Sequence, residues 1–180
     1  MIFTTVGTQL PFDRLLRGMD SWAARNQDVS IVAQAGASRC PLPNIQTVSQ
    51  LSQSEFRDHM NAARLIVAHA GMGTILSATE LGLPVILMPR LAKFGEHRND
   101  HQCDTAREMA RLSNVTIVED GESLHQALDL ARARNFEIPR MSSADTASEL
   151  DPLIDTIRDF VWSDTAPVQV NALANGRQAA

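Results

Sequence analysis

Apolar runs and segments of helical period alternate along the chain. Six short apolar runs predict strands, at residues 1–6, 29–33, 45–48, 65–69, 84–88 and 115–118. Helical spacing of apolar residues predicts helices at 11–25, 53–63, 74–82, 99–112 and 122–134, with a later one near 151–162. Runs such as 85–88 (Val-Ile-Leu-Met) are continuously apolar, as in parallel strands buried on both faces. The alternation therefore predicts an α/β fold, a Rossmann-like doubly wound parallel sheet.

Local signals predict where some of these elements start. Ser52 and Glu55 have the spacing of a capping box, which starts the second helix. Pro11 suits the first position of the first helix. Residues 34–44 and 89–98 contain prolines, glycines and polar residues and are expected to be irregular loops.

Length, charge and composition limit the possible classes of protein. The 180 residues, 44% of them hydrophobic, suit one domain, expected over 1–163, with a disordered Ala/Asn/Gln-rich tail at 164–180. The net charge of −5 argues against a nucleic-acid partner. No run approaches the ~20 apolar residues of a membrane-spanning helix, and the N-terminus lacks signal-peptide features, so we expect a cytoplasmic protein. Cys40 and Cys103 lie far apart and are expected to be free thiols.

Candidate chemistry lies in the loops that follow predicted strands. Ligands of open α/β sheets bind beyond the carboxyl ends of the strands, so the loops after residues 6, 69 and 88 should converge on one crevice. The first loop carries Gly7, which permits close backbone approach, and Thr8, which offers a hydroxyl and an N–H. Taken alone, this loop is more simply read as an ordinary strand–helix turn.

The second turn has the sequence His-Ala-Gly-Met-Gly-Thr and begins at His69, at the end of a predicted strand. Gly71 and Gly73 can adopt backbone angles closed to other residues, Thr74 can cap the following helix, and His69 can donate a hydrogen bond to a diphosphate. Backbone N–H groups and the helix dipole meet at such a turn, which suits a phosphate. Glu80, about two helical turns on, could then accept hydrogen bonds from sugar hydroxyls.

The third cluster is residues 96–102, Glu-His-Arg-Asn-Asp-His-Gln. His97 and His101 stand four apart and would share a helix face that could bind zinc. No third ligand has suitable spacing and the H-E-x-x-H pattern is absent, so we expect no metal site. Donors and acceptors entering a helix suit the hydroxyls of a sugar, and a polar surface loop is the alternative.

In this order, the motifs resemble a known family. This order of motifs resembles the nucleotide-sugar-binding half of GT-B glycosyltransferases, specifically the family 28 C-terminal domain. The motifs are the turn starting at His69, then Glu80, then the Gly-Leu-Pro and apolar strand of 82–90, and then Asn-Asp-His-Gln at 99–102. The chain is similar to the small soluble catalytic subunits of two-component UDP-sugar transferases. These subunits serve dolichol-linked oligosaccharide N-acetylglucosaminyltransferases and bacterial exopolysaccharide glycosyltransferases or glucuronosyltransferases. The resemblance covers roughly residues 1–135.

The resemblance implies that a UDP-sugar lies across the carboxyl ends of the sheet. Its diphosphate would lie between the first loop and the second turn, its ribose on Glu80, and its uracil near the backbone of Gln50 and Leu51. His101 and Gln102 would hold the transferred sugar. Catalytic roles fall to His69, Glu80 and His101. Donor-binding roles fall to Gly7, Thr8, Gly71, Met72, Gly73, Thr74, Glu80, Asn99, Asp100, His101 and Gln102.

The resemblance also implies how the reaction is divided between chains. The transfer needs no essential cofactor or metal, because helix dipoles and N–H groups stabilise the leaving UDP. The general base belongs to an acceptor domain that this chain is expected to lack. We therefore expect a membrane-anchored acceptor-binding partner subunit, a lipid-linked saccharide acceptor and recruitment of the chain to the inner face of the membrane. The hexose could be N-acetylglucosamine, glucose or glucuronic acid.

Three other functions remain open on the sequence. A non-catalytic UDP or UDP-sugar-binding regulatory module would keep the same binding residues. A UDP-sugar epimerase shares the architecture, but those enzymes carry both halves on one chain, which 180 residues do not suit. A plain interaction protein would bind no uridine nucleotide.

Overall fold

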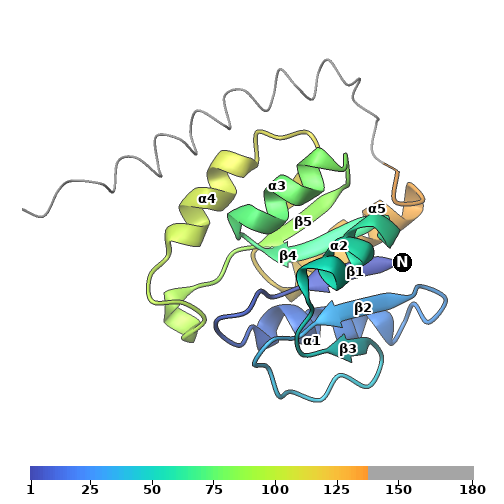
Figure 1. Cartoon of the computed structure of the whole chain (residues 1–180), viewed down its shortest axis with the longest axis horizontal. Coiled ribbons are helices and arrows are strands. Elements are labelled where there is room, and N and C mark those ends of the chain that lie inside the picture. The colour runs from blue at the N-terminus through green and yellow to red at the C-terminus, as the bar shows by residue number, and fades with distance from the viewer. Residues whose placement is uncertain (138–180) are drawn as a thin grey trace, which may run out of the picture. The chain divides into compact units, whose positions relative to one another are not determined.

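The computed structural model describes residues 1–137 (Figure 1). The helix expected near 151–162, the domain boundary at 163 and the tail at 164–180 lie outside the described residues, so all three stay predictions. None of the helices between residues 1 and 137 is both long and apolar enough to cross a membrane.

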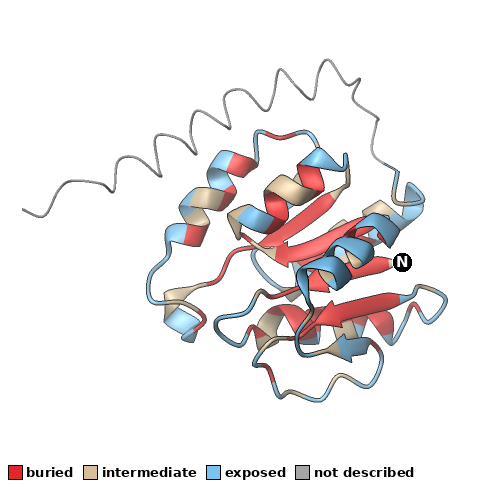
Figure 2. Ribbon diagram, viewed as in Figure 1, coloured by how far each residue is buried: buried red, intermediate tan, exposed pale blue. Residues whose placement is uncertain are grey.

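The described strands form one parallel sheet in the order β3-β2-β1-β4-β5-β6. The strands are β1 (Ile2–Thr5), β2 (Ile31–Gln34), β3 (Gln46–Val48), β4 (Leu65–His69), β5 (Val85–Met88) and β6 (Val115–Ile117). All six predicted strands are confirmed within two residues at either end. The four inner strands, β1, β2, β4 and β5, are buried almost throughout (Figure 2), which is why each is a short apolar run in the sequence.

Helices cover both faces of the sheet, as the doubly wound prediction requires (Figure 1). They are α1 (Asp13–Ala23), α2 (Gln53–Ala62), α3 (Met72–Glu80), α4 (His101–Met109) and α5 (Gly121–Ala133), and a short 3-10 helix, η1 (Ala92–Phe94), lies before α4. α1 and α5 pack on one face, where Trp22 donates to Asp129 over 2.7 Å. α2, α3 and α4 lie on the other face, where Phe3 of β1 contacts Phe56 of α2 edge to face.

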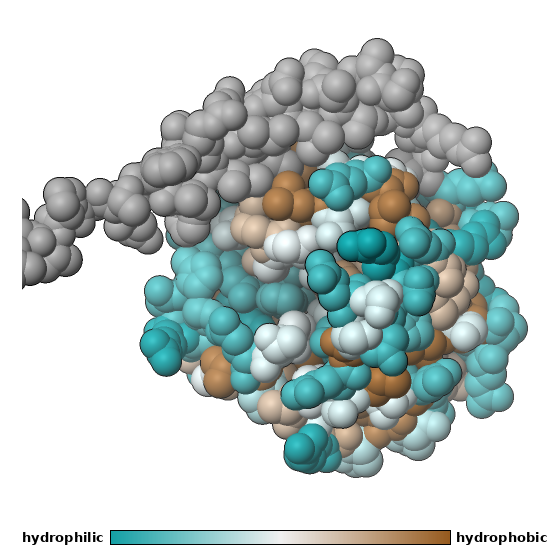
Figure 3. All heavy atoms as spheres, in the orientation of Figure 1, coloured by the Kyte–Doolittle hydropathy of each residue, from teal (hydrophilic) through white to brown (hydrophobic). Residues whose placement is uncertain are grey.

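The face of the described residues that Figure 3 shows is mostly polar, and the hydrophobic atoms on it form small separate groups among hydrophilic ones. The large apolar side chains that are most exposed are Leu10, Leu81, Phe94 and Leu130.

Two of the predicted helix starts are wrong and one is confirmed. The backbone N–H of Phe12 donates to Ser38 over 3.1 Å and Phe12 is not helical, so α1 begins after it and Pro11 lies outside the helix. α3 begins at Met72 with Gly71 at its N-cap, so Thr74 is a buried third helical residue rather than a cap. The capping box of Ser52 with Glu55 is present as predicted.

Candidate functional site

The sheet reverses its winding between β1 and β4, and the candidate site lies where these two strands end. The connection from β1 goes to α1 on one face and the connection from β4 goes to α3 on the other. Such a topological switch point opens a crevice at the carboxyl edge of the sheet, where nucleotides bind in this fold class. We call Gly7, Thr8, His69 and residues 71–74 the switch-point site.

The imidazole of His69 fills the space between the two glycine turns. A Cβ added to Gly71 would lie 2.9 Å from its Cε1, 3.0 Å from its Cδ2 and closer still to its Nε2, and one added to Gly7 would lie 2.9 Å from Cε1. Both positions therefore need glycine because the ring leaves no room for a side chain. The expected unusual backbone angles at Gly71 and Gly73 are absent, whereas Gly7 has a φ of +73°.

A third loop packs against the same place. Gly36, after β2, has a φ of +56°, and a Cβ there would lie 2.8 Å from the carbonyl oxygen of Gly7. The hydroxyl of Thr5 donates to Gln34 over 2.6 Å, which ties the ends of β1 and β2 together. The loops that follow β1, β2 and β4 are thus in direct contact.

His69 is uncharged at neutral pH. Burial lowers its pKa to about 4, with further lowering by the charges of Arg90 and His97 and an opposing effect of the Thr5 backbone. Its Nδ1 is buried without a hydrogen-bond partner in the described part of the chain. As a neutral ring, His69 offers one N–H donor, and a direct contact with diphosphate stays a prediction.

The N-terminus of α3 is open to a ligand. Gly71 has no side chain with which to cap the helix, so the N–H groups of Met72, Gly73 and Thr74 lie at its uncapped positive end. Gly73 is exposed, and a Cβ added there would meet no atom within 4 Å. This is the arrangement of a helix N-terminus that binds an anion.

Arg90, directly after β5, links the loops that follow β1 and β5. The residue is only 3% exposed, and Gln102 accepts a hydrogen bond from its backbone N–H over 3.1 Å. Its guanidinium donates to the carbonyl oxygens of Val6, Leu10, Pro11 and Glu96. The sequence motifs assigned no role to Arg90. Its position directly after a wholly apolar strand could have indicated a buried arginine at the carboxyl edge of the sheet.

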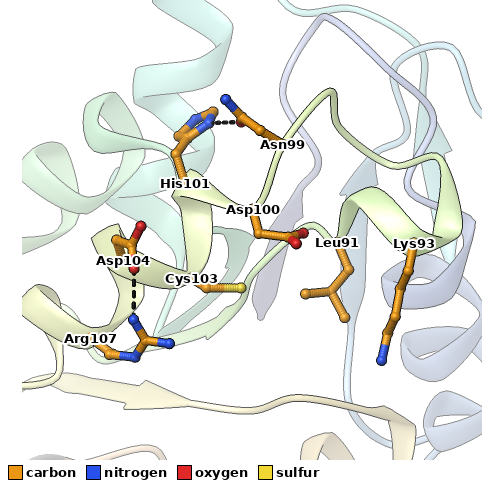
Figure 4. Close-up of a pocket in the computed structure, with 8 residues that line it drawn as sticks. All are labelled: Leu91, Lys93, Asn99, Asp100, His101, Cys103, Asp104 and Arg107. Atoms are coloured by element: carbon orange, nitrogen blue, oxygen red, sulfur yellow. Dashed lines mark hydrogen bonds and ion pairs between the residues drawn. The ribbon is translucent and has the colours of Figure 1, made fainter.

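The residues at the start of α4 are mostly engaged with the protein itself. Gln102 is buried, and Asp100 accepts a hydrogen bond from the backbone of Ala92 over 2.7 Å. Asn99 is hydrogen-bonded to the Nδ1 side of His101. An open hollow of about 580 Å³ adjoins them (Figure 4), lined by Leu91, Lys93, Asn99, Asp100, His101, Cys103, Asp104 and Arg107. Its polar lining offers donors and acceptors to a hydroxylated ligand.

No metal site is evident between residues 1 and 137. The rings of His97 and His101 meet edge to face with centroids 4.4 Å apart, but no cluster of three or more metal-binding side chains lies in this range. Cys40 and Cys103 are free thiols, as predicted.

Two predicted contacts lie apart from the switch-point site. Glu80 is the exposed last residue of α3, about 12 Å along the helix axis from Met72. Gln50 and Leu51 follow β3, whose strand lies two positions from β1 and so about 10 Å away. These residues can contact only the far parts of a ligand that extends from the switch-point site.

Comparisons with known proteins agree with this fold. The UDP-N-acetylglucosamine–N-acetylmuramyl-(pentapeptide) pyrophosphoryl-undecaprenol N-acetylglucosamine transferase of Desulforudis audaxviator is 26% identical over 148 residues, covering 80% of this chain and 36% of that protein. The UDP-N-acetylglucosamine transferase subunit ALG13 of Yarrowia lipolytica is 23% identical over 156 residues, covering 76% of this chain and 75% of that protein. This chain thus spans about a third of the first relative and three quarters of the second.

The fold itself is found in a solved relative. The solution structure of ALG13 has a TM-score of 0.57 and 17% identity, covering 83% of this chain and 93% of that chain, which shows the shared fold. A family model described as the glycosyltransferase family 28 C-terminal domain matches residues 1–157, further than the expected 1–135. Since the match includes both glycine turns and the start of α4, the chain belongs to the glycosyltransferase family 28 C-terminal domain family.

Proposed function

We propose that this chain binds a UDP-sugar at the switch-point site and supplies the donor half of a glycosyltransferase. The observation that carries the proposal is the contact of the two glycine turns around His69, beside the uncapped N-terminus of α3. Backbone N–H groups and a helix dipole there favour a diphosphate, and family membership favours a nucleotide-sugar.

The proposed pose runs outward from the diphosphate. The diphosphate lies between Thr8 and the first turn of α3, where the helix dipole stabilises the charge that develops on departing UDP. Ribose extends toward Glu80. The transferred sugar faces Asn99 and His101, at one end of the hollow seen in Figure 4. Asp100 and Gln102 hold the loop between β5 and α4, because a side-chain oxygen of each accepts a hydrogen bond from a backbone N–H of that loop.

We propose that a second chain completes the enzyme. The general base that activates the acceptor hydroxyl would come from a membrane-anchored, acceptor-binding subunit, which would bring this chain to the inner face of the membrane. Two findings support the division: one relative is named a transferase subunit, and the other is about three times as long as the matched part. The acceptor would be a lipid-linked saccharide in exopolysaccharide or glycan biosynthesis.

A binding experiment tests the donor. Both relatives are named for UDP-N-acetylglucosamine, so we would titrate the purified chain with that donor, UDP-glucose, UDP-glucuronic acid, UDP and, as the nucleobase control, ADP. Calorimetry is expected to show binding of UDP and of one UDP-sugar above the others, and weaker binding of ADP. Failure to bind any uridine nucleotide would contradict the proposal and favour a plain interaction protein.

An activity experiment tests the division between chains. The chain alone should show little transferase activity, and co-expression with a membrane-anchored partner encoded beside it should restore transfer to a lipid-linked acceptor. Robust turnover by the isolated chain would refute the need for a partner. UDP-sugar binding with no transfer by the complex would instead favour a non-catalytic regulatory module.

A further inference from the structure

We propose that Arg90 is a positioning residue for the diphosphate of the bound nucleotide: its buried guanidinium fixes the loop that carries Gly7 and Thr8 and keeps a positive charge behind it. This inference rests on the proposed nucleotide binding and names the group that organises the site. Arg90 is buried and bonds the backbone of the loop, so it would act on the ligand through the loop backbone and its electric field.

The first line of support is the hydrogen bonding of the guanidinium. Arg90 bonds the loop at both ends, to Val6 over 2.7 Å on one side and to Leu10 and Pro11 over 2.7 and 2.8 Å on the other. The exposed Thr8 lies between these anchor points. Because a lysine ammonium cannot span such a fork of carbonyl oxygens, the geometry depends on arginine itself.

The second line of support is the charge. The Arg90 side chain donates to backbone carbonyls and to no carboxylate of residues 1–137. The carboxylate of Glu96 accepts from Nε and Nη2 of Arg14 instead, over 2.9 and 2.8 Å. Arg14 is thus paired with Glu96 and also acts electrostatically on the exposed carboxylate of Asp120. In the group of Arg14, Arg90 and Glu96, Arg90 is the buried cation that hydrogen-bonds no carboxylate in the described part of the chain, so it carries the surplus positive charge. Burying a surplus charge is unfavourable unless something compensates it, and an anionic ligand would do so.

The third line of support is location. The charge of Arg90 helps to lower the pKa of His69, so the guanidinium acts electrostatically on the ring that both glycine turns enclose. The Phe12 ring lies 4.7 Å from the Arg90 Cζ and covers it on one side. The positive charge is thus directed at the switch-point site from within the protein.

The test separates effects on phosphate from effects on the whole fold. We would measure the affinities of uridine, UMP and UDP for the full chain, for Arg90→Lys and for the matched control Arg132→Lys. Arg132 bonds side-chain oxygens of Asn26 and Asp28 near the amino end of β2, so it is a more exposed arginine that also bonds several oxygens but lies away from the site. Arg90→Lys is expected to weaken UDP binding by about tenfold or more while uridine changes by less than about twofold, and Arg132→Lys should leave the UDP-to-uridine ratio unchanged.

A second variant keeps the test decisive if Arg90→Lys does not fold. Glu96→Gln removes the only carboxylate of the group and leaves the fork of Arg90 in place, because that fork uses the Glu96 carbonyl. The ratio of the UDP affinity to the uridine affinity should then stay at or above that of the wild type, and it should decrease more steeply as the salt concentration rises. Equal weakening of all three ligands in Arg90→Lys, or a loss of the ratio in Glu96→Gln, would overturn this inference. Wild-type protein that binds none of the three would instead overturn the proposed function.

Discussion

A methyl group added at Gly71 would occupy space that the His69 ring now fills. Gly71 has a φ of −101°, which any residue adopts, so Gly71→Ala brings no backbone strain. The added Cβ would lie 2.9 Å from the ring Cε1, and Gly7 borders the same end of the ring, which limits its movement. Overpacking of this kind costs about 1–3 kcal/mol of unfolding free energy. A smaller cost, about 0.5–1 kcal/mol, comes from alanine being a poorer N-cap than glycine.

A double-mutant cycle isolates the contact. We would measure unfolding free energies by urea denaturation at pH 7.5 for the wild type, Gly71→Ala, His69→Ala and the double variant. The N-cap cost is present in both backgrounds and cancels, whereas the clash exists only when His69 is present. The expected coupling is therefore about 1–3 kcal/mol, with Gly71→Ala nearly tolerated beside His69→Ala. An equal cost of Gly71→Ala in both backgrounds would refute the assignment of this glycine to the histidine ring.

Three further predictions address the site. Gly73→Ala should raise the unfolding free energy by about 0.5–1 kcal/mol, because the position is helical and open. The added methyl group should also weaken UDP binding about tenfold, because it would occupy the space proposed for the phosphate. Unchanged UDP affinity would argue against that placement of the phosphate. Folding lowers the pKa of His69 from 6.5 to about 4, so between these pH values the unfolded state binds a proton more readily than the native state. The unfolding free energy should therefore fall by about 3 kcal/mol as the pH decreases from 6.5 to 4. His69→Gln should lose correspondingly less stability over that range, and parallel pH–stability curves would disprove the shift. Glu80→Ala should weaken UDP binding several-fold with little change in stability, since the side chain is exposed, and calorimetry showing equal affinity would remove Glu80 from the site.

The sheet could be predicted from the sequence because its inner strands are buried on both faces. β5 is a continuous apolar run between Pro84 and Pro89, and β4 is apolar up to His69. Such short apolar runs are typical of strands buried on both faces of a parallel sheet. The convergence of the loops after β1, β4 and β5 was also predictable, since parallel strands end at one edge. The approach of Gly7 to the His69 ring and the hydrogen bonds of Arg90 to Val6 and Leu10 confirm that convergence.

The helix starts and the packing of the site could not be predicted in the same way. Pro11 and Thr74 each fit a local rule for a helix start, but tertiary contacts decided where the helices begin. Gly71 was expected to need an unusual backbone angle, and it needs space for a ring instead. Three of the backbone carbonyls that accept from the Arg90 guanidinium lie about 80 residues away in the sequence, and backbone groups carry no sequence signal. Sequence patterns identify the residues of such a site better than the contacts that make them necessary.

The structure divides the motif residues by what their polar groups already do. Arg90, Glu96 and Gln102 are buried and use their side chains within the protein, so they hold the loops around the site. Thr8, in the loop after β1, and Gly73, in the first turn of α3, are exposed and leave room for a ligand. Substitutions in the first group should therefore affect a ligand through the loops that they hold, whereas those in the second should change the space open to the ligand itself. A motif that looks uniform in the sequence thus contains a buried supporting layer and an exposed layer, and the second is the one that our proposal places against the diphosphate.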